Sequence, residues 1–378
     1  MHKLTQNTRT DIRSLCFEGG VDEHHAVIRI IQPMLSFREQ RDNILTALRE
    51  LTEGQITGAR PVFLRFFLSD AANQSGLLTE ALADFPPCAC SIIEQPPLDG
   101  TKIALWVYLQ TQVTPRSFPE GLTGIEHNGY VHLWGGSACR PGTDSHEQTR
   151  RLLEDYATAL EDNGGRLADN CIRTWFFVQN IDVNYAGVVK ARNEVFLHQG
   201  LTRDTHFIAS TGIAGRNADP SLCVQLDTYA VTGLVPEQVH HLYASTHLNR
   251  TYEYGVSFER GTYVDYGDRR QVFISGTASI DNRGQIVHAG DIRQQTERMW
   301  ENVEALLKEA GMNYDDIGQM IVYLRDPGDY QTVERLFNAR FPNMPRVTVL
   351  APVCRPGWLI EMECMGTCKW TDKRFRAF

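Results

Sequence analysis

Long apolar stretches are missing from this sequence of 378 residues. A helix that crosses a membrane needs about 20 consecutive apolar residues, and no run in the chain approaches that length. The first seven residues, Met-His-Lys-Leu-Thr-Gln-Asn, also lack the apolar core of a signal peptide. We therefore expect a cytoplasmic protein that has no membrane partner.

An excess of positive charge is missing as well. Lys and Arg number 37 against 46 Asp and Glu, which gives a formal net charge of −9. Proteins that bind nucleic acid usually present a basic face to the phosphates. The charge balance therefore argues against nucleic acid as a partner.

The nine cysteines lack the arrangement of a disulfide framework or of a zinc site. Their number is odd and no export signal accompanies them, which favours free thiols. Cys88 and Cys90 are close in sequence, as are Cys364 and Cys368, but the two pairs do not have zinc-site spacing. We expect no metal and no cofactor.

What the chain does contain is one pattern repeated three times: a capped amphipathic helix, an apolar strand, a second helix and two closing strands. A chain of this length is too long for one ordinary core, so several domains are expected. Each first helix starts with an N-cap residue followed three residues later by Glu or Gln, which is a capping box. The three boxes are Ser36/Glu39, Asp144/Glu147 and Asp291/Gln294.

The repeats predict the domain boundaries. We expect repeats over residues 1–115, 116–235 and 236–368, followed by a polar, basic tail at 369–378 that is disordered or packs on a neighbour. Helices that alternate with short strands in this way pack on one face of a small sheet, which is an α+β fold. In the first repeat only residues 14–34 are available for the opening hairpin, and they fit it loosely. In the third, the alternation of Tyr252, Tyr254, Val256 and Phe258 predicts an extra strand.

The last strands of the third repeat carry the residues best suited to chemistry. Arg346 follows Pro345 at a strand start, where a guanidinium can grip a carboxylate through two parallel hydrogen bonds. Glu361 and Glu363 alternate onto one face of an otherwise apolar strand. We interpret Glu361 as a general acid or base whose pKa is raised by burial and by the second carboxylate, and Glu363 as structural.

Other residues are candidates for the wall of a binding site. Cys354 lies on the turn before the last strand and is interpreted as lining the site, because nothing near it in sequence would activate it as a nucleophile. Tyr263 is an aromatic candidate for the same wall. The run Ser210-Thr211-Gly212 lacks the Lys and the helix of a phosphate-binding loop, but its hydroxyls and amides are suited to facing a cleft.

The third repeat resembles the RidA (YjgF) superfamily, also called the endoribonuclease L-PSP family. The matching residues are Ile274-Ser-Gly276, Gly290-Asp291 with Gln295-Thr296, Asn302-Val303, Val322-Tyr-Leu324 with Asp326, Pro345-Arg346 and Ile360-Glu-Met-Glu363. The resemblance implies small α+β domains that form trimers with a ligand cleft at each contact. Three tandem RidA-like (chorismate-mutase-like) domains would form an intramolecular pseudo-trimer, each with a mixed sheet and two helices on one face. The protein would then be a monomer or a low homo-oligomer.

Within that superfamily the chain is most similar to the chorismatases, which hydrolyse chorismate. The similar segments are Ser275-Gly-Thr-Ala-Ser-Ile280, His288-Ala-Gly-Asp291, Val353-Cys-Arg355 and Leu359-Ile-Glu-Met-Glu363. Two segments depart from the chorismatase pattern: Arg192-Asn193, where an Asn-x-x-Arg order is expected, and the loop Asp281-Asn-Arg-Gly284.

The resemblance implies one fully equipped site, built from the third repeat and a neighbour. Counting back from the closing strands places Ser210 near the position of Arg346 and Gln225 near that of Glu361. The expected site residues are Glu361 and Arg346 for catalysis, with Arg346, Cys354, Ser275, Gly276, Thr211 and Tyr263 binding a small carboxylate-bearing metabolite. Three functions stay open: hydrolysis of a chorismate-like enol ether to pyruvate and a cyclohexadiene or hydroxybenzoate, deamination of an enamine or imine, and ligand binding without turnover.

Overall fold

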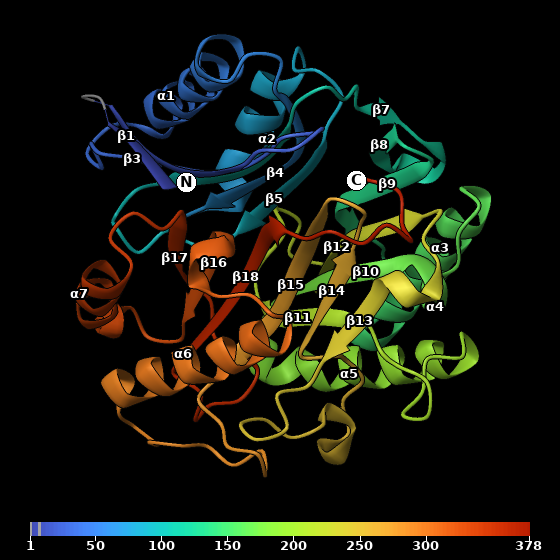
Figure 1. The fold of residues 1–378 in the computed structure, drawn as a ribbon. Helices are drawn as coiled ribbons and strands as arrows, with labels where there is room; N and C mark the ends of the chain where they lie inside the picture. Colours follow the sequence, from blue (N-terminus) through green and yellow to red (C-terminus); the bar gives the residue numbers. More distant parts are fainter. Residues whose placement is uncertain (1, 7–8) are drawn as a thin grey trace.

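Three six-stranded sheets follow one another along the chain in the computed structural model, which describes residues 2–6 and 9–378. Their strands lie within residues 2–110, 116–232 and 239–369. Figure 1 shows the three units in blue, green and yellow to red, with the sheets toward the centre. Each sheet with its helices is called a repeat below.

The first repeat has the strand order β1-β2-β3-β6-β4-β5. Its strands are β1 (His2–Gln6), β2 (Thr10–Phe17), β3 (Glu23–Ile30), β4 (Arg60–Leu68), β5 (Ala89–Glu94) and β6 (Ile103–Gln110). Its helices are α1 (Phe37–Arg49), which continues into a π-helical turn (Glu50–Gln55), and α2 (Ala71–Leu82). The opening hairpin is therefore real, and it begins earlier than the sequence suggested.

The second repeat has the order β11-β10-β12-β9-β8-β7. Its strands are β7 (Arg116–Ser117), β8 (Thr123–His127), β9 (Tyr130–Cys139), β10 (Cys171–Val178), β11 (Ala209–Ala214) and β12 (Val224–Thr232). Its helices are α3 (Ser145–Asp162), the single turn α4 (Leu167–Asn170) and α5 (Ile181–His198).

The third repeat has the order β13-β14-β15-β18-β16-β17. Its strands are β13 (Val239–Leu242), β14 (Gly261–Asp265), β15 (Arg269–Ala278), β16 (Ile317–Leu324), β17 (Arg346–Leu350) and β18 (Ile360–Lys369). Its long helices are α6 (Ile292–Glu309) and α7 (Tyr330–Arg340). The four-strand order β15-β18-β16-β17 is the same as β9-β12-β10-β11 and β3-β6-β4-β5. The three units are therefore repeats of one fold.

Local sequence signals explain where the long helices begin. Ser36 and Glu39 form a complete capping box at the start of α1. Asp144 accepts a hydrogen bond from the backbone N–H of Glu147, and Asp291 accepts from the N–H groups that follow it. These side chains satisfy donors that a helix N-terminus leaves without partners. The predicted helix starts are confirmed.

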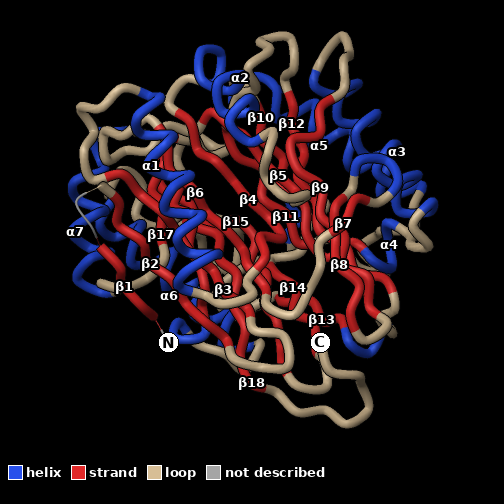
Figure 2. Tube along the Cα trace, turned by 90° about the horizontal axis from the view of Figure 1, so that it is seen from above, coloured by secondary structure: helices blue, strands red, loops and turns tan. Residues whose placement is uncertain are grey.

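The repeats close into a ring because the edge strand of each one lies against the sheet of the next. β5 lies against β9, β11 against β15, and β17 against β3. One core cluster runs through all three repeats and includes Phe63, Trp175 and Ile321 from the three central strands. In Figure 2 the strands gather in the middle and the helices lie around the outside. The predicted α+β pseudo-trimer within one chain is confirmed.

Of the two alternatives expected for the tail, packing is the one found: Phe378 is 1% exposed, and its ring contacts His132 of the second repeat and Tyr266 of the third. The expected extra strand after residue 251 is wrong, because Thr251–Tyr254 is a 3-10 turn and the chain then continues to β14 outside any regular strand. None of the helices in the described part of the chain has the length and apolar character needed to cross a membrane.

Candidate active site

A cavity lies where edge strand β11 of the second repeat meets β15 of the third. The space between its walls, including the part open to solvent, is about 500 Å³. Its walls come from β11, β15, β18, helix α5, the segment from the 3-10 turn at Tyr254 to Arg260, and the loop that carries Cys354. The residues that line the cavity include Arg192, Thr211, Tyr254, Arg260, Gly276, Cys354, Arg355 and Glu361.

Glu361 on β18 supplies a carboxyl group that keeps its proton at neutral pH. Burial raises the pKa of Glu361 to about 8, with a further contribution from the negative charge of Glu363, while Arg260 and Arg173 oppose the shift. The residue is 4% exposed and lines the cavity. A carboxylic acid with a pKa near the working pH is suited to general acid catalysis.

Gly276 makes room for that carboxyl group. A Cβ atom at this position would lie 2.1 Å from Glu361 Oε1 and 3.1 Å from Thr211 Cγ2. The register of β15 against β18 shifts between Ile274 and Thr277, which marks an irregularity at this point. Glycine is therefore required where the carboxyl group and the edge strand approach the backbone.

Arg192 brings a positive charge into the cavity from helix α5. The residue is 1% exposed, and its Nε and Nη2 atoms have no hydrogen-bond partner among the described residues. Phe176 and Phe258 flank the guanidinium, each with its ring centre 5.8 Å from Cζ. A buried cation with free donors is costly unless an anionic group pairs with it. Arg192 is thus placed to hold a carboxylate.

The sequence contains a signal for Arg192 besides its departure from the chorismatase pattern. Val188, Arg192, Val195 and Phe196 are spaced to share one helix face, and all four are buried. A charged residue on an apolar helix face is unusual and often functional. The alternating run held a second signal, because Tyr254, Val256, Phe258 and Arg260 all line the cavity.

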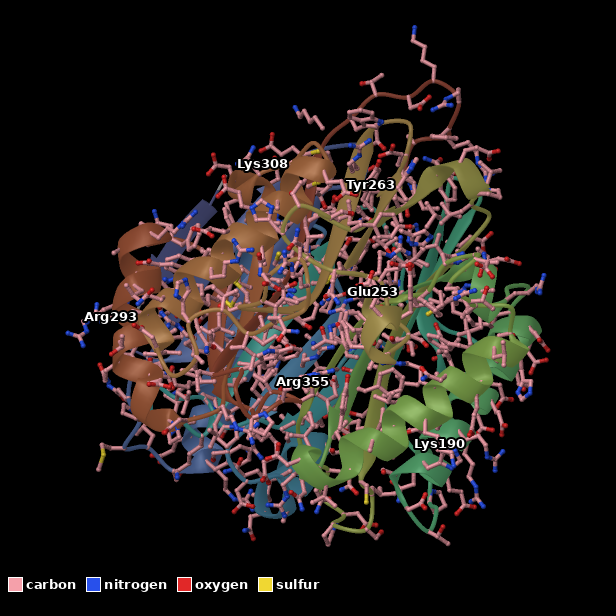
Figure 3. All side chains as sticks on the ribbon, turned by 90° about the horizontal axis from the view of Figure 1, so that it is seen from below. Lys190, Glu253, Tyr263, Arg293, Lys308 and Arg355 are labelled. Carbon is pink, nitrogen blue, oxygen red and sulfur yellow. The ribbon has the colours of Figure 1, made fainter. Side chains whose placement is uncertain are left out.

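Two further arginines complete the positive wall. Arg260 donates from Nη2 to the side-chain oxygen of Asn249 at 2.9 Å and to its backbone carbonyl at 3.0 Å, which fixes its position. Arg355 is exposed, and its guanidinium lies over the rings of Tyr254 and Trp358. In Figure 3 Arg355 is drawn to the left of Lys190 on helix α5 and of Glu253 in the 3-10 turn.

Cys354 lines the cavity as a neutral thiol. Burial raises the pKa of Cys354 to about 12, and the neighbouring Glu361 adds to the rise. The thiolate is the nucleophilic form, so a thiol with this pKa is a wall group at neutral pH. This geometry fits the lining role expected for Cys354.

Ser275 and Thr211 join the two strands that flank the cavity. Ser275 Oγ accepts a hydrogen bond from the Ser210 backbone N–H at 2.9 Å and donates to the Glu259 carbonyl at 2.6 Å. Thr211 Oγ1 accepts from the Gly276 N–H at 2.9 Å. Ser275 is fully buried behind the wall, whereas Thr211 and Gly276 reach the cavity itself.

The structure does not bring Arg346 to this site. Its Nη2 donates to Glu334 Oε2 at 2.7 Å and to Asn338 Oδ1 at 3.1 Å, and Glu334 also pairs with Arg29 of the first repeat. Strand β17 lies against the first repeat, whereas the cavity lies between the second and third. The expectation that Arg346 and Glu361 share one site is corrected, and Arg192 takes the place of Arg346 in the cavity.

Tyr263 is also outside the cavity. Its ring stacks on His240 with centroids 4.5 Å apart, and the Arg270 guanidinium lies over it at 4.2 Å. Figure 3 draws Tyr263 well away from Arg355. The binding role expected for Tyr263 is corrected, and Tyr254 is the tyrosine that lines the cavity.

Strand register shows which residues replace Glu361 in the other repeats. The strands β16, β10 and β4 each have a register shift near their start, where they pair with β18, β12 and β6. Four positions after the shift, the paired residue is Glu361 on β18, Gln225 on β12 and Ala104 on β6. Gln225 donates to the Ile92 carbonyl and to Ser137 Oγ, each at 3.2 Å. A carboxyl group therefore stands at this position in only one of the three repeats.

Comparisons with known proteins agree with this fold. The family described as endoribonuclease L-PSP matches residues 258–368. A RutC family protein of Pyrococcus abyssi is 36% identical over 98 residues, which span 25% of this chain and 76% of that protein. The 3-aminoacrylate deaminase RutC of Acinetobacter baylyi is 30% identical over 97 residues, spanning 25% of this chain and 77% of that protein.

A solved structure covers more of the chain. The crystal structure of a chorismatase aligns with 81% of this chain and 92% of its own length, with a TM-score of 0.64 and 20% sequence identity. At that identity the likeness concerns the fold. It extends the resemblance from the third repeat to most of the ring.

Proposed function

Because the chain belongs to the RidA, or endoribonuclease L-PSP, superfamily, we propose that it is a small-molecule enzyme acting on a carboxylate-bearing enol ether of the chorismate type. One observation carries the proposal: the buried Glu361 carboxyl group, whose pKa burial raises to about 8, and the Arg192 guanidinium, whose Nε and Nη2 atoms have no partner among the described residues, line the same cavity. Glu361 is the acid, and Arg192 binds the substrate carboxylate.

The reaction begins with proton transfer from Glu361. The acid protonates the methylene carbon of the enol ether, so that its O–H bond breaks, a C–H bond forms and an oxocarbenium ion results. Water adds to the cationic carbon, and the Glu361 carboxylate accepts the proton that this water releases. The hemiketal then collapses to pyruvate and an alcohol. General acid catalysis of this kind contributes about 10²–10⁴ in rate.

Arg192 and Arg260 have different roles in the proposed reaction. Arg192 is buried between the rings of Phe176 and Phe258, where the low local dielectric strengthens a charge-assisted hydrogen bond. Arg260 is held by Asn249 and sits close enough to Glu361 to lower its pKa against the effect of burial. It is therefore suited to stabilising the carboxylate that forms when Glu361 gives up its proton.

Imine deamination is the second candidate, and the similarity to a protein described as a 3-aminoacrylate deaminase favours it. The same cavity serves it: Arg192 holds the carboxylate, while Glu361 handles the water that adds to the C=N carbon. The products would be a keto acid and ammonia.

The two reactions are separated by their products. Purified protein is incubated with chorismate and, separately, with an enamine generated in the assay by a second enzyme, and pyruvate and ammonia are measured. We expect pyruvate release from chorismate. Ammonia release alone would support deamination, and release of neither product would contradict both candidate reactions.

A further inference from the structure

Arg325 follows strand β16 and is not among the described residues that line the cavity, yet it holds two elements that form its walls. Its Nη1 donates to the Val353 backbone carbonyl at 2.7 Å, in the cavity loop of residues 351–359. Its Nη2 donates to the carboxylate of Asp182, in the first turn of helix α5. One guanidinium therefore joins the second and third repeats at the junction that forms the cavity.

The ion pair with Asp182 is partly exposed, but one of its partners is already fixed. The side chains of Asp182 and Arg325 are 46% and 20% exposed. Exposed ion pairs contribute little when two flexible side chains must lose their freedom to meet. Here the bond to the Val353 carbonyl already orients the planar guanidinium, so pairing with Asp182 restricts it less. The pair is suited to fixing a position even though it adds little to stability.

The cavity loop is held at points on both sides of the Arg325 contact. The Ala214 N–H at the end of β11 donates to the Pro352 carbonyl at 3.1 Å. The buried Gln295 side chain donates to the Gly357 carbonyl at 3.1 Å. The carbonyl that Arg325 holds lies between these two points, directly before the residues of the loop that line the cavity.

Helix α5 is fastened to the third repeat near both of its ends. Asn193 forms hydrogen bonds with the segment that precedes β14, and Asp182 pairs with Arg325. Arg192 lies beside Asn193, whereas Asp182 lies about 15 Å away along the helix axis. Without the Asp182 pair the helix would pivot near Asn193. Arg192 would then move little, and Tyr185, which also lines the cavity, would move more.

The other two repeats have uncharged residues at the position of Arg325. These residues are Ser69 and Gln179, and each backbone N–H donates to the carbonyl just before the closing strand, as that of Arg325 does. Ser69 Oγ accepts from Gln74 of its own repeat, and Gln179 Oε1 has no partner among the described residues. Of the three equivalent residues, the charged one stands in the repeat that carries Glu361.

We propose that Arg325 is a positioning residue: it fixes the start of helix α5 against the cavity loop and so sets the place of a substrate held by Arg192 relative to Glu361. The inference rests on the proposed roles of Arg192 and Glu361. Arg325 touches neither the substrate nor the reacting atoms. A displacement of about 1 Å caused by a distant change is enough to lower a rate about 10²-fold.

The first test needs no substrate. Amide hydrogen exchange is measured in the full-length wild type and in Arg325→Met, which removes both hydrogen bonds of the guanidinium. We expect exchange about 10-fold faster in residues 351–356 and 183–188. Arg335→Met, an exposed change on α7 whose guanidinium donates to Gln331 of the same helix, is the control and should leave both segments unchanged. Wild-type exchange of both segments in Arg325→Met would overturn the proposal.

A double-mutant cycle with Asp182→Ala separates positioning from mere support of the loop. Asp182→Ala removes the link to α5 and leaves the bond from Arg325 to Val353 in place. Each single change should lower kcat with chorismate about 10-fold with little change in KM, and the double variant should be no slower than Arg325→Met. Additive effects on kcat, or a lower melting temperature with an unchanged kcat, would show that Arg325 only supports the loop.

The inference and the proposed function can fail separately. Faster exchange of both segments in a protein that turns over neither chorismate nor the enamine keeps the Arg325 link between α5 and the loop but removes the proposed reactions. Chorismate turnover by folded Arg325→Met at the wild-type rate would overturn the positioning role and leave the proposed function standing.

Discussion

The guanidinium of Arg346 and the carboxyl group of Glu361 stand two strands apart in one sheet, yet they serve different junctions of the ring. Arg346 pairs in register with Met320 on β16, which pairs with Cys364 on β18. The edge strand β17 faces the first repeat, while Glu361 faces the second. In a cyclic arrangement each junction takes its edge strand from one repeat and its closing strand from the next. Arg346 and Glu361 would meet at one junction only if identical copies of the third repeat were neighbours in the ring.

Arg346 is therefore expected to support stability and not turnover. It is almost fully buried, burial lowers its pKa to about 10, and it ties Glu334 to the junction that also holds Arg29. Arg346→Met should lower the free energy of unfolding by about 1–3 kcal/mol, because Glu334 and Asn338 lose a buried donor. Chemical denaturation measures this. A large fall in kcat/KM at a temperature where the variant is folded would contradict the assignment.

Arg192, in contrast, is expected to support substrate binding and not stability. Its Nε and Nη2 atoms have no partner among the described residues, so the free protein gains little from the charge. Arg192→Met should raise KM about 100-fold, as expected for the loss of a charge-assisted hydrogen bond to a carboxylate. The melting temperature of the free protein should stay level or rise. Lys190→Met, an exposed change on the same helix, serves as the control.

The raised pKa of Glu361 predicts how stability depends on pH. The folded-state value of about 8 lies above the ordinary value of 4.5, so the folded protein keeps a proton that the unfolded chain loses between these values. The stabilising contribution is complete below pH 4.5 and is lost as pH rises toward 8. Glu361→Gln has no titrating proton at this position, so it does not undergo this loss of stability. Its melting temperature should exceed that of the wild type more at pH 8 than at pH 5, as a scanning-calorimetry series would show.

Asn193 should control access to the cavity. Its side-chain amide donates to the Gly255 carbonyl at 3.0 Å and accepts from Ser257 Oγ at 2.5 Å, which fastens the segment that carries Tyr254 and Phe258 to helix α5. Asn193→Ala should raise amide hydrogen exchange in residues 252–258 and raise KM about 10-fold. Unchanged exchange in that segment would show that other contacts hold it.

Much of the fold is predictable because it depends on local signals. Ser36, Asp144 and Asp291 mark helix starts by satisfying backbone donors, which sequence spacing reveals directly. The residue that replaces Glu361 in the second repeat, Gln225, also follows from counting along equivalent strands. These signals need no knowledge of how the repeats contact one another.

The site is less predictable because it forms between repeats. Arg192 and Glu361 lie 169 positions apart, and only ring closure brings helix α5 to β18. Tyr254, Val256 and Phe258 of the alternating run line the cavity, but alternate residues of a segment can face one wall without belonging to a strand. A strand also needs a partner for its backbone, and this segment makes only a single bridge, at Glu259.

The central claim is that the proton on Glu361 drives the reaction at the one equipped junction. The most direct test is pyruvate release from chorismate by Glu361→Gln under saturating conditions, beside Glu301→Gln, an exposed change on α6, as the control. The account predicts that Glu361→Gln binds chorismate as tightly as the wild type, that its kcat falls by about 10²–10⁴, and that Glu301→Gln is unaffected. A Glu361→Gln enzyme that releases pyruvate at the wild-type rate would contradict it.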